Sequence, residues 1–179
     1  ALSMNLVNGF TGIFSLGHAG FMAIGAYSVA LLTIPVAKKE TIFMLEPLIA
    51  PLNTLTLPFG VALIIGGLLA AALAFLIGLP CLRLRGDYLA IATLGFSEII
   101  RIVITNAQCL TNGAQGLKSI PATANIWWCY GIALATIVFI ALLISSSYGR
   151  AFKAIREDEI AAESMGVSLL RHKMLSFML

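Results

Sequence analysis

Long apolar runs, separated by short polar segments, dominate the pattern along the chain. The runs 59–79 and 126–144 hold no charged residue, and the run 88–105 is apolar apart from Glu98 and Arg101. A helix that crosses a membrane needs roughly 20 mainly apolar residues. Each of these runs is therefore predicted to be a membrane-spanning helix.

The first apolar run, residues 2–34, is too long for one straight span, because its helix would reach roughly 50 Å at about 1.5 Å per residue. Its middle, 8–20, is rich in glycine and small polar residues, and glycine costs a helix interior about 1 kcal/mol relative to alanine. The pattern predicts a helix, a break, and a second helix over 18–34. Non-helical backbone survives at membrane depth only where protein or a watery cavity surrounds it. The break is therefore a candidate for a transport pathway.

Small residues recur at every fourth position along the run 59–79, at Gly66, Ala70, Ala74 and Gly78. Such a stripe lets the backbone of a second helix approach closely, although an alanine-rich helix also produces this spacing by chance. We expect another helix to pack against the stripe.

Composition narrows the class of protein further. Of the 179 residues, 60% are hydrophobic and 11% are charged, whereas a soluble domain carries about 25% charged residues. So few charges cannot coat a water-exposed surface, which excludes a soluble, disordered or nucleic-acid-binding protein. The sequence has no nucleophile–base pair, carboxylate dyad, phosphate-binding glycine loop or metal-ligand spacing. We therefore expect neither an enzyme nor a metal or cofactor site.

Lysine and arginine are unevenly divided between the segments that join the runs. The segments 36–57 and 106–125 hold three of them, and the segments 81–87 and 148–173 hold seven. The three are Lys38, Lys39 and Lys118, and the seven are Arg83, Arg85, Arg150, Lys153, Arg156, Arg171 and Lys173. The positive-inside rule places the richer segments in the cytoplasm. Aromatic residues at the start of the run 126–144, as in an interface belt, would then lie at the outer face.

The segment 148–173 is the one long charged stretch, and its sequence predicts an ordered piece. Asp158 can cap the N-terminus of a short helix over 159–165, where acidic residues in the first turn favour the helix dipole. Gly166 suits a left-handed residue just past the end of that helix. Ser168 can cap the helix that follows.

The side chains of Ala161 and Ala162 are small, so they project little from the surface of this short helix and allow close contact. The functional interpretation is that the helix seats in a groove of another protein. The alternative is a solvated hairpin in which acidic and basic residues balance one another.

Polar residues in the first run form a second set of candidates. Asn5, Asn8, Thr11 and Ser15 are spaced at three, three and four residues, so a continuous helix would carry them on one face. Such a stripe could bind a zwitterionic substrate, or it could join helices by hydrogen bonds worth about 1 kcal/mol each. His18 has no partner for a metal site, so it either stabilises the break or lines the pathway.

Glu98 and Arg101 share a helix face, since they are three residues apart. Charges inside a membrane usually pair or face a pore, but both residues could instead lie near the membrane end and touch water. An ion-coupled carrier needs an isolated acid in mid-span, for which Glu98 is the candidate and the adjacent Arg101 weakens the case. A scaffold that transports nothing would not need the polar break.

Three blocks of sequence stand out. Block 5–27 contains Asn-Gly-Phe-Thr-Gly and Ser-Leu-Gly-His-Ala-Gly, block 82–101 opens with Leu-Arg-Leu-Arg-Gly-Asp-Tyr, and block 148–166 contains Gly-Arg-Ala-Phe-Lys-Ala-Ile-Arg. A weaker motif, Asn-Gly-Ala-Gln-Gly, occupies 112–116. In this order the blocks resemble the permease subunits of ABC importers for branched-chain amino acids, of the LivM type.

The resemblance implies an all-α integral membrane protein, a polytopic helical bundle with a broken first helix and a short cytoplasmic docking helix. Because the family continues with further spans, we expect the chain to be a fragment of a longer permease. The expected organisation is one transmembrane permease domain over 1–179, with spans at 2–34 (broken), 59–79, 88–105 and 126–144, and an ATPase-docking segment at 148–173.

By the same resemblance the protein is a permease subunit of the cytoplasmic (inner) membrane of a bacterium or archaeon. It would translocate branched-chain or related amino acids that a periplasmic binding protein delivers. A second homologous permease subunit would complete the path through the bilayer, and separate ABC ATPase subunits would bind the ATP. The alternatives are a permease for another small solute, such as urea, and an ion-coupled transporter or channel.

Two sets of site residues follow. The candidates for the substrate pathway are Asn5, Asn8, Thr11, Ser15, His18, Thr93 and Glu98. The candidates for ATPase docking are Asp158, Glu159, Ala161, Ala162 and Gly166. Many ABC importers carry Glu-Ala-Ala-x-x-x-Gly in the docking helix, whereas here Ile160 separates Glu159 from the two alanines, so the register of this helix differs from the common pattern.

Overall fold

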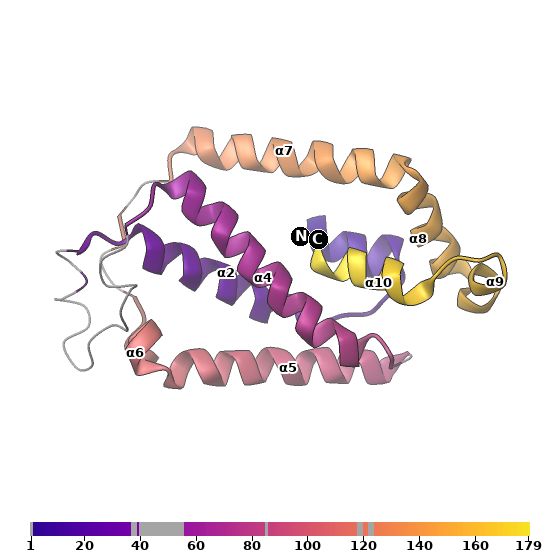
Figure 1. Cartoon of the computed structure of the whole chain (residues 1–179), viewed down its shortest axis with the longest axis horizontal. Coiled ribbons are helices and arrows are strands. Elements are labelled where there is room, and N and C mark those ends of the chain that lie inside the picture. Colours follow the sequence, from indigo (N-terminus) through magenta and orange to yellow (C-terminus); the bar gives the residue numbers. More distant parts are fainter. Residues whose placement is uncertain (1, 37–38, 40–55, 85, 118–119, 122–123) are drawn as a thin grey trace.

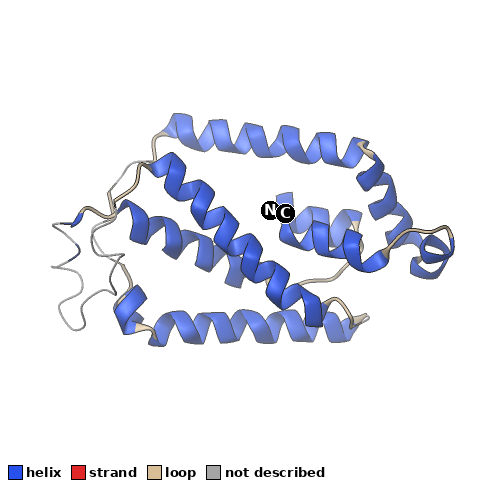
Figure 2. Cartoon of the chain, in the orientation of Figure 1, coloured by secondary structure: helices blue, strands red, loops and turns tan. Residues whose placement is uncertain are grey.

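The computed structural model describes residues 2–36, 39, 56–84, 86–117, 120–121 and 124–179, and the regular elements in these ranges are all helical (Figure 2). The predicted all-α fold is thus confirmed for the described residues. In chain order the elements are α1 (Leu2–Asn5), the π-helix η1 (Leu6–Phe10), α2 (His18–Thr33), α4 (Phe59–Cys81), α5 (Asp87–Asn106), α6 (Gln108–Thr111), the 3-10 turn η2 (Gly113–Gln115), α7 (Ile126–Ser145), α8 (Ser147–Glu157), α9 (Glu159–Ser164) and α10 (Leu169–Met178).

Among the described helices, α4, α7 and the part of α5 from Tyr88 to Asn106 are long and apolar enough to cross a membrane. Their positions match the predicted runs with small differences at the ends. The run 59–79 was bounded by Pro80, but α4 continues through Pro80 and ends at Cys81. A proline removes one hydrogen bond from a helix and kinks it, and here the helix ends one residue later.

Figure 1 shows how these helices are arranged. α4, α5 and α7 run along the length of the molecule, and α8 and α9 lie beyond one end of them. α1 and η1 lead from the interior toward that end, and α2 leads away from it. α10 lies beside η1 and α4 inside the bundle. The first apolar run is therefore a pair of half-length segments, as the broken-helix prediction required.

Two different helices pack against the stripe of small residues on α4. A Cβ atom added to Gly66 would lie 3.2 Å from the carbonyl oxygen of Gly25 on α2. A Cβ added to Gly78 would lie 2.9 Å from the sulfur of Met174 on α10. The predicted packing role of the stripe is confirmed: one end receives α2 and the other end receives α10.

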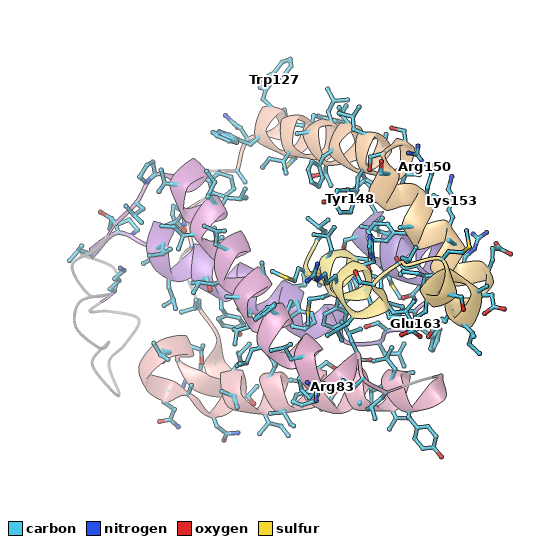
Figure 3. The ribbon with its side chains drawn as sticks, turned by 45° about the vertical axis from the view of Figure 1, so that its right-hand side comes forward. Arg83, Trp127, Tyr148, Arg150, Lys153 and Glu163 are labelled. Carbon is cyan, nitrogen blue, oxygen red and sulfur yellow. The ribbon has the colours of Figure 1, made fainter. Side chains whose placement is uncertain are left out.

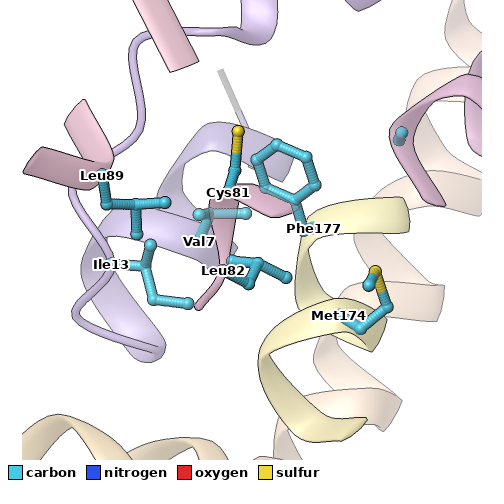
Figure 4. Packing of buried hydrophobic residues seen from close by; sticks show 8 residues of the cluster. Val7, Ile13, Cys81, Leu82, Leu89, Met174 and Phe177 are labelled. Atoms are coloured by element: carbon cyan, nitrogen blue, oxygen red, sulfur yellow. The ribbon is translucent and has the colours of Figure 1, made fainter. Parts of the chain in front are cut away.

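A hydrophobic cluster fills the end of the bundle where these segments meet (Figure 4). It joins η1, the stretch after it, the end of α4, the start of α5 and α10. Phe177 of this cluster also packs edge-to-face on Phe21 of α2, with ring centroids 5.4 Å apart. The buried members are Val7, Ile13, Ala74, Cys81, Leu82, Leu89, Met174 and Phe177.

α7 stands apart from this core. It has no buried residue, and near its N-terminal end Trp128 meets Phe59 edge-to-face with centroids 5.6 Å apart. Figure 3 shows Trp127 at one end of α7 and Arg150 and Lys153 beyond its other end. Aromatic and basic residues therefore lie at opposite ends, as the predicted orientation requires, although Lys38, Arg85 and Lys118 of that prediction lie outside the described residues.

Replacing Gly66 with alanine should weaken the packing of α2 on α4. The carbonyl of Gly25 is backbone and cannot move aside, and overpacking of this kind costs about 1–3 kcal/mol. The neighbouring Gly67 is the matched control, since a Cβ there has no atom within 4 Å. We expect a lower melting temperature for Gly66→Ala than for Gly67→Ala in detergent, and equal melting temperatures would contradict the packing role.

Membrane orientation can be tested with single cysteines in a background without the native cysteines. Asn125 and Lys153 are exposed and flank α7 at opposite ends. If the basic segments are cytoplasmic, an impermeant thiol reagent added to intact cells should label Asn125→Cys and spare Lys153→Cys. The reverse labelling pattern would invert the orientation.

Candidate functional site

The break in the first helix spans residues 11–17, between η1 and α2. Gly12 begins the change of direction with φ +71°, a region that side chains other than glycine rarely adopt. A Cβ on Gly12 would also lie 2.8 Å from Cγ and 3.3 Å from Cα of Arg156 on α8. Both the backbone angle and the close approach of α8 therefore require glycine at this position.

Side chains supply hydrogen bonds for the backbone of the break. The N–H of Ser15 donates to Oδ1 of Asn8 at 3.2 Å. The N–H of Leu16 donates to Oγ1 of Thr93 on α5 at 3.1 Å, and this hydroxyl donates in turn to the carbonyl of Ala90 at 3.0 Å. Backbone groups in a membrane bundle must be satisfied within the protein, so these two side chains hold the break in its observed shape.

The prediction that Asn5, Asn8, Thr11 and Ser15 form one helical stripe is wrong. Regular helix ends at Phe10, so the last two of these residues lie in the break. Thr11 and Ser15 are buried, and the hydroxyl of Thr11 donates to the carbonyl of Leu6 at 3.1 Å. Asn5 is exposed. Two of the four side chains bind backbone of the break: Oδ1 of Asn8 accepts from the N–H of Ser15, and Oγ of Ser15 accepts from the N–H of Gly17.

The end of η1 is also bound by a residue of α8. Nη1 of Arg156 on α8 donates to the carbonyl of Gly9 at 3.2 Å, while Nη2 of the same side chain pairs with Glu157 at 2.6 Å. The last carbonyls of a helix lack partners within it. Arg156 satisfies one of them, which connects α8 to the broken helix just before α9 begins.

A cavity of about 560 Å³ lies between α1, α2, α4 and α10. Its walls are small or apolar except for Ser3 and His18. Nδ1 of His18 is buried and has no hydrogen-bond partner among the described residues, a state that costs about 1–3 kcal/mol. The residues around this cavity are Ser3, Met4, His18, Ala19, Phe21, Met22, Gly67, Ala70, Ala71, Ala74, Phe177, Met178 and Leu179.

Glu98 is not brought together with the other pathway candidates. It lies on an exposed face of α5, where Oε2 is 3.3 Å from Nη1 of Arg101. The shared face predicted for this pair is confirmed. Among the described residues neither member lines the cavity beside His18.

The local structure of the docking segment follows its prediction closely. Oδ1 of Asp158 accepts hydrogen bonds from the N–H groups of Ile160 at 2.8 Å and Ala161 at 3.1 Å, so the predicted cap of α9 is confirmed. Gly166 has φ +85°, as a left-handed residue past a helix end should. The cap predicted for Ser168 is wrong in part: α10 begins after it, but its side chain makes no cap hydrogen bond.

The expected surface of α9 needs a correction at Ala162. This residue is only 4% exposed, because a helix of six residues that packs on the chain turns one side inward. Ala161 does lie on the open side. So do two apolar residues that the sequence analysis did not single out, Ile160 at 71% and Met165 at 85% exposed. The sequence feature that could have identified them is a large apolar side chain within a charged segment.

Sequence reasoning also missed an ion pair within this segment. Nζ of Lys173 on α10 lies 2.6 Å from Oε1 of Glu159 on α9, and the Lys173 side chain is only 7% exposed. Both residues line a groove of about 400 Å³, together with Arg83 and Glu163. Because the partners are 14 residues apart, no helical spacing could have indicated the pair.

Comparison with known proteins places these features in a family. The family model for the permease component of branched-chain amino acid transport systems matches residues 1–179. The high-affinity branched-chain amino acid transport system permease protein LivM of Escherichia coli K12 is 37% identical over 98% of this chain and 45% of its own length. The protein of the same name from Salmonella typhimurium LT2 is 36% identical over the same shares.

A more distant relative is the probable branched-chain amino acid transport permease protein LivM of Methanocaldococcus jannaschii, 25% identical over 96% of this chain and 56% of its own length. The chain thus spans about half the length of these relatives, and no solved structure matches it. The resemblance carried by the three sequence blocks is confirmed. The chain belongs to the family of multi-pass membrane permease components of branched-chain amino acid transport systems.

Proposed function

We propose that this chain is part of a permease subunit through which an ABC importer moves branched-chain amino acids across a membrane. The observation that carries the proposal is the broken first helix, whose two halves border a partly open cavity between α1, α2, α4 and α10. A break at membrane depth is tolerated where it is buried in protein or lines a cavity, and transporters use such broken helices for their substrate sites. The names of the Escherichia coli and Salmonella relatives support the transport system and the substrate class.

The chemistry of the cavity suits an aliphatic amino acid. Its methyl, thioether and phenyl groups offer an apolar surface for a branched side chain. His18 begins α2, so its imidazole sits where the helix dipole favours a negative charge. We propose that His18 and the adjacent end of α2 meet the carboxylate of the substrate, and that Asn8 and Thr93 hold the break in place.

The partners follow from the family and from the exposed side of α9. Ile160 and Met165 project from a charged segment at the end of the bundle that is predicted to be cytoplasmic. Burying a large apolar side chain contributes about 1.5–3 kcal/mol, so these two residues fit a groove on an ATPase subunit. A second permease subunit and a periplasmic binding protein complete the proposed importer.

Other functions fit the molecule less well. An ion-coupled carrier would use Glu98, yet this carboxylate is exposed on α5 and paired with Arg101. Urea has no aliphatic part to match the walls of the cavity. Branched-chain amino acids delivered to an ATP-driven permease remain the best fit.

Changing Gly12 to alanine in the full-length permease should abolish uptake without preventing membrane insertion. A non-glycine residue at this φ costs about 1–3 kcal/mol, and the new Cβ would collide with Arg156. Gly95→Ala is the control, since a Cβ at Gly95 meets nothing within 4 Å. The measurement is uptake of radiolabelled leucine by cells that lack their own importer. Equal uptake by the two variants would mean that the break contributes to helix packing and not to transport.

Changing Ile160 to aspartate should separate the permease from its ATPase. Ile160 is exposed in the isolated chain, so the substitution should leave folding intact while placing a charge in an apolar contact. Co-purification of the ATPase on a tagged permease is the measurement. Lys153→Gln is the control, because single exposed charges contribute only about 0–1 kcal/mol. A normal complex with Ile160→Asp would rule out docking through this side of α9.

A further inference from the structure

We propose that the ion pair between Glu159 and the buried Lys173 transmits movement of the docking helix α9 into the membrane bundle. This inference rests on the proposed function, and it assigns the two residues a positioning role. ATPase subunits that pull or push α9 would, through this pair, displace α10 and so reshape the cavity beside His18.

The pair differs from the other ion pairs of the described residues. Arg101 and Glu98 lie three apart on one helix, and Arg156 and Glu157 are neighbours in sequence. Those pairs are exposed and cannot hold two elements together. The pair of Glu159 and Lys173 joins α9 to α10 over 2.6 Å, with the lysine side chain almost wholly buried.

The Lys173 side chain is 7% exposed, whereas that of Glu159 is 40% exposed. Separating the two groups would leave the buried ammonium group of Lys173 without its partner, which is unfavourable. The neighbouring charges are Arg83 and Glu163, which line the same groove but are both exposed. Among the described residues, Lys173 forms an ion pair with Glu159 and with no other residue.

From Lys173, α10 leads directly to the cavity. One residue later, Met174 packs against Gly78 of α4 so closely that a Cβ there would be 2.9 Å from its sulfur. One turn further on, Phe177 meets Phe21 of α2 edge-to-face at 5.4 Å. Phe21 and Phe177 both line the cavity that also holds His18.

These contacts form a continuous path of packed side chains from α9 to the cavity. Coupling between distant sites is carried by packed side chains, ion pairs and rigid elements of this kind. Without the pair, α9 would keep its exposed side for the ATPase but would lose its charged link to α10. The expected defect is therefore in transmission and not in docking.

The test uses the full-length permease with its second subunit, ATPase and binding protein, reconstituted in vesicles. The main variant is Lys173→Met, which removes the buried charge and keeps the docking candidate Glu159 as a partly exposed carboxylate. Three quantities are measured: ATPase retained on the purified complex, ATP hydrolysed, and leucine taken up. The control is Arg171→Met, an exposed residue of the same helix.

We expect Lys173→Met to retain its ATPase, while leucine uptake per ATP falls about tenfold, within the usual range for coupling between sites. Arg171→Met should match the native protein. Native uptake per ATP in Lys173→Met would overturn the proposal. Loss of the ATPase from Lys173→Met would overturn it too, since the pair would then belong to docking. If the native complex itself shows no ATP-driven uptake, the proposed function fails instead.

Discussion

The need to satisfy backbone polar groups away from water governs this structure. Helix ends after Phe10, and the seven residues that follow must find hydrogen bonds inside the bundle. Their N–H groups donate to the side chains of Asn8, Ser15 and Thr93, while Arg156 binds the last turn of η1. Because these partners come from α5 and α8 as well as from the first segment itself, the break determines how the helices around it are placed.

The same contacts connect the interior of the bundle with its charged end. Arg156 reaches the broken helix from α8, the helix before α9, and Lys173 reaches α9 from α10, the helix after it. α9 is therefore attached on both sides to elements that border the break or the cavity. This attachment is the basis of the coupling that we propose between an ATPase subunit and the cavity beside His18.

Much of the fold and part of the candidate site follow from local sequence. Three apolar runs, the stripe on α4, the glycine-rich break and the Asp158 cap were all predictable, since each depends on residues close together in the chain. The predictions that failed concerned the direction in which side chains point. Asn5 and Ser15 were placed on one helical face that does not exist, and Ala162 was placed on the open side of α9 although it is buried.

By itself, the sequence determined that the chain is a bundle of apolar helices with one interrupted helix and one ordered charged segment. Hydrophobic period, helix length and capping are properties of a few neighbouring residues, and a bilayer enforces them strictly. Only the tertiary structure decided three contacts between distant residues. Thr93 accepts a hydrogen bond from Leu16 across 77 residues, Arg156 donates to Gly9 across 147, and Lys173 pairs with Glu159 across 14. Such pairings depend on how helices pack, and no spacing along the chain encodes that.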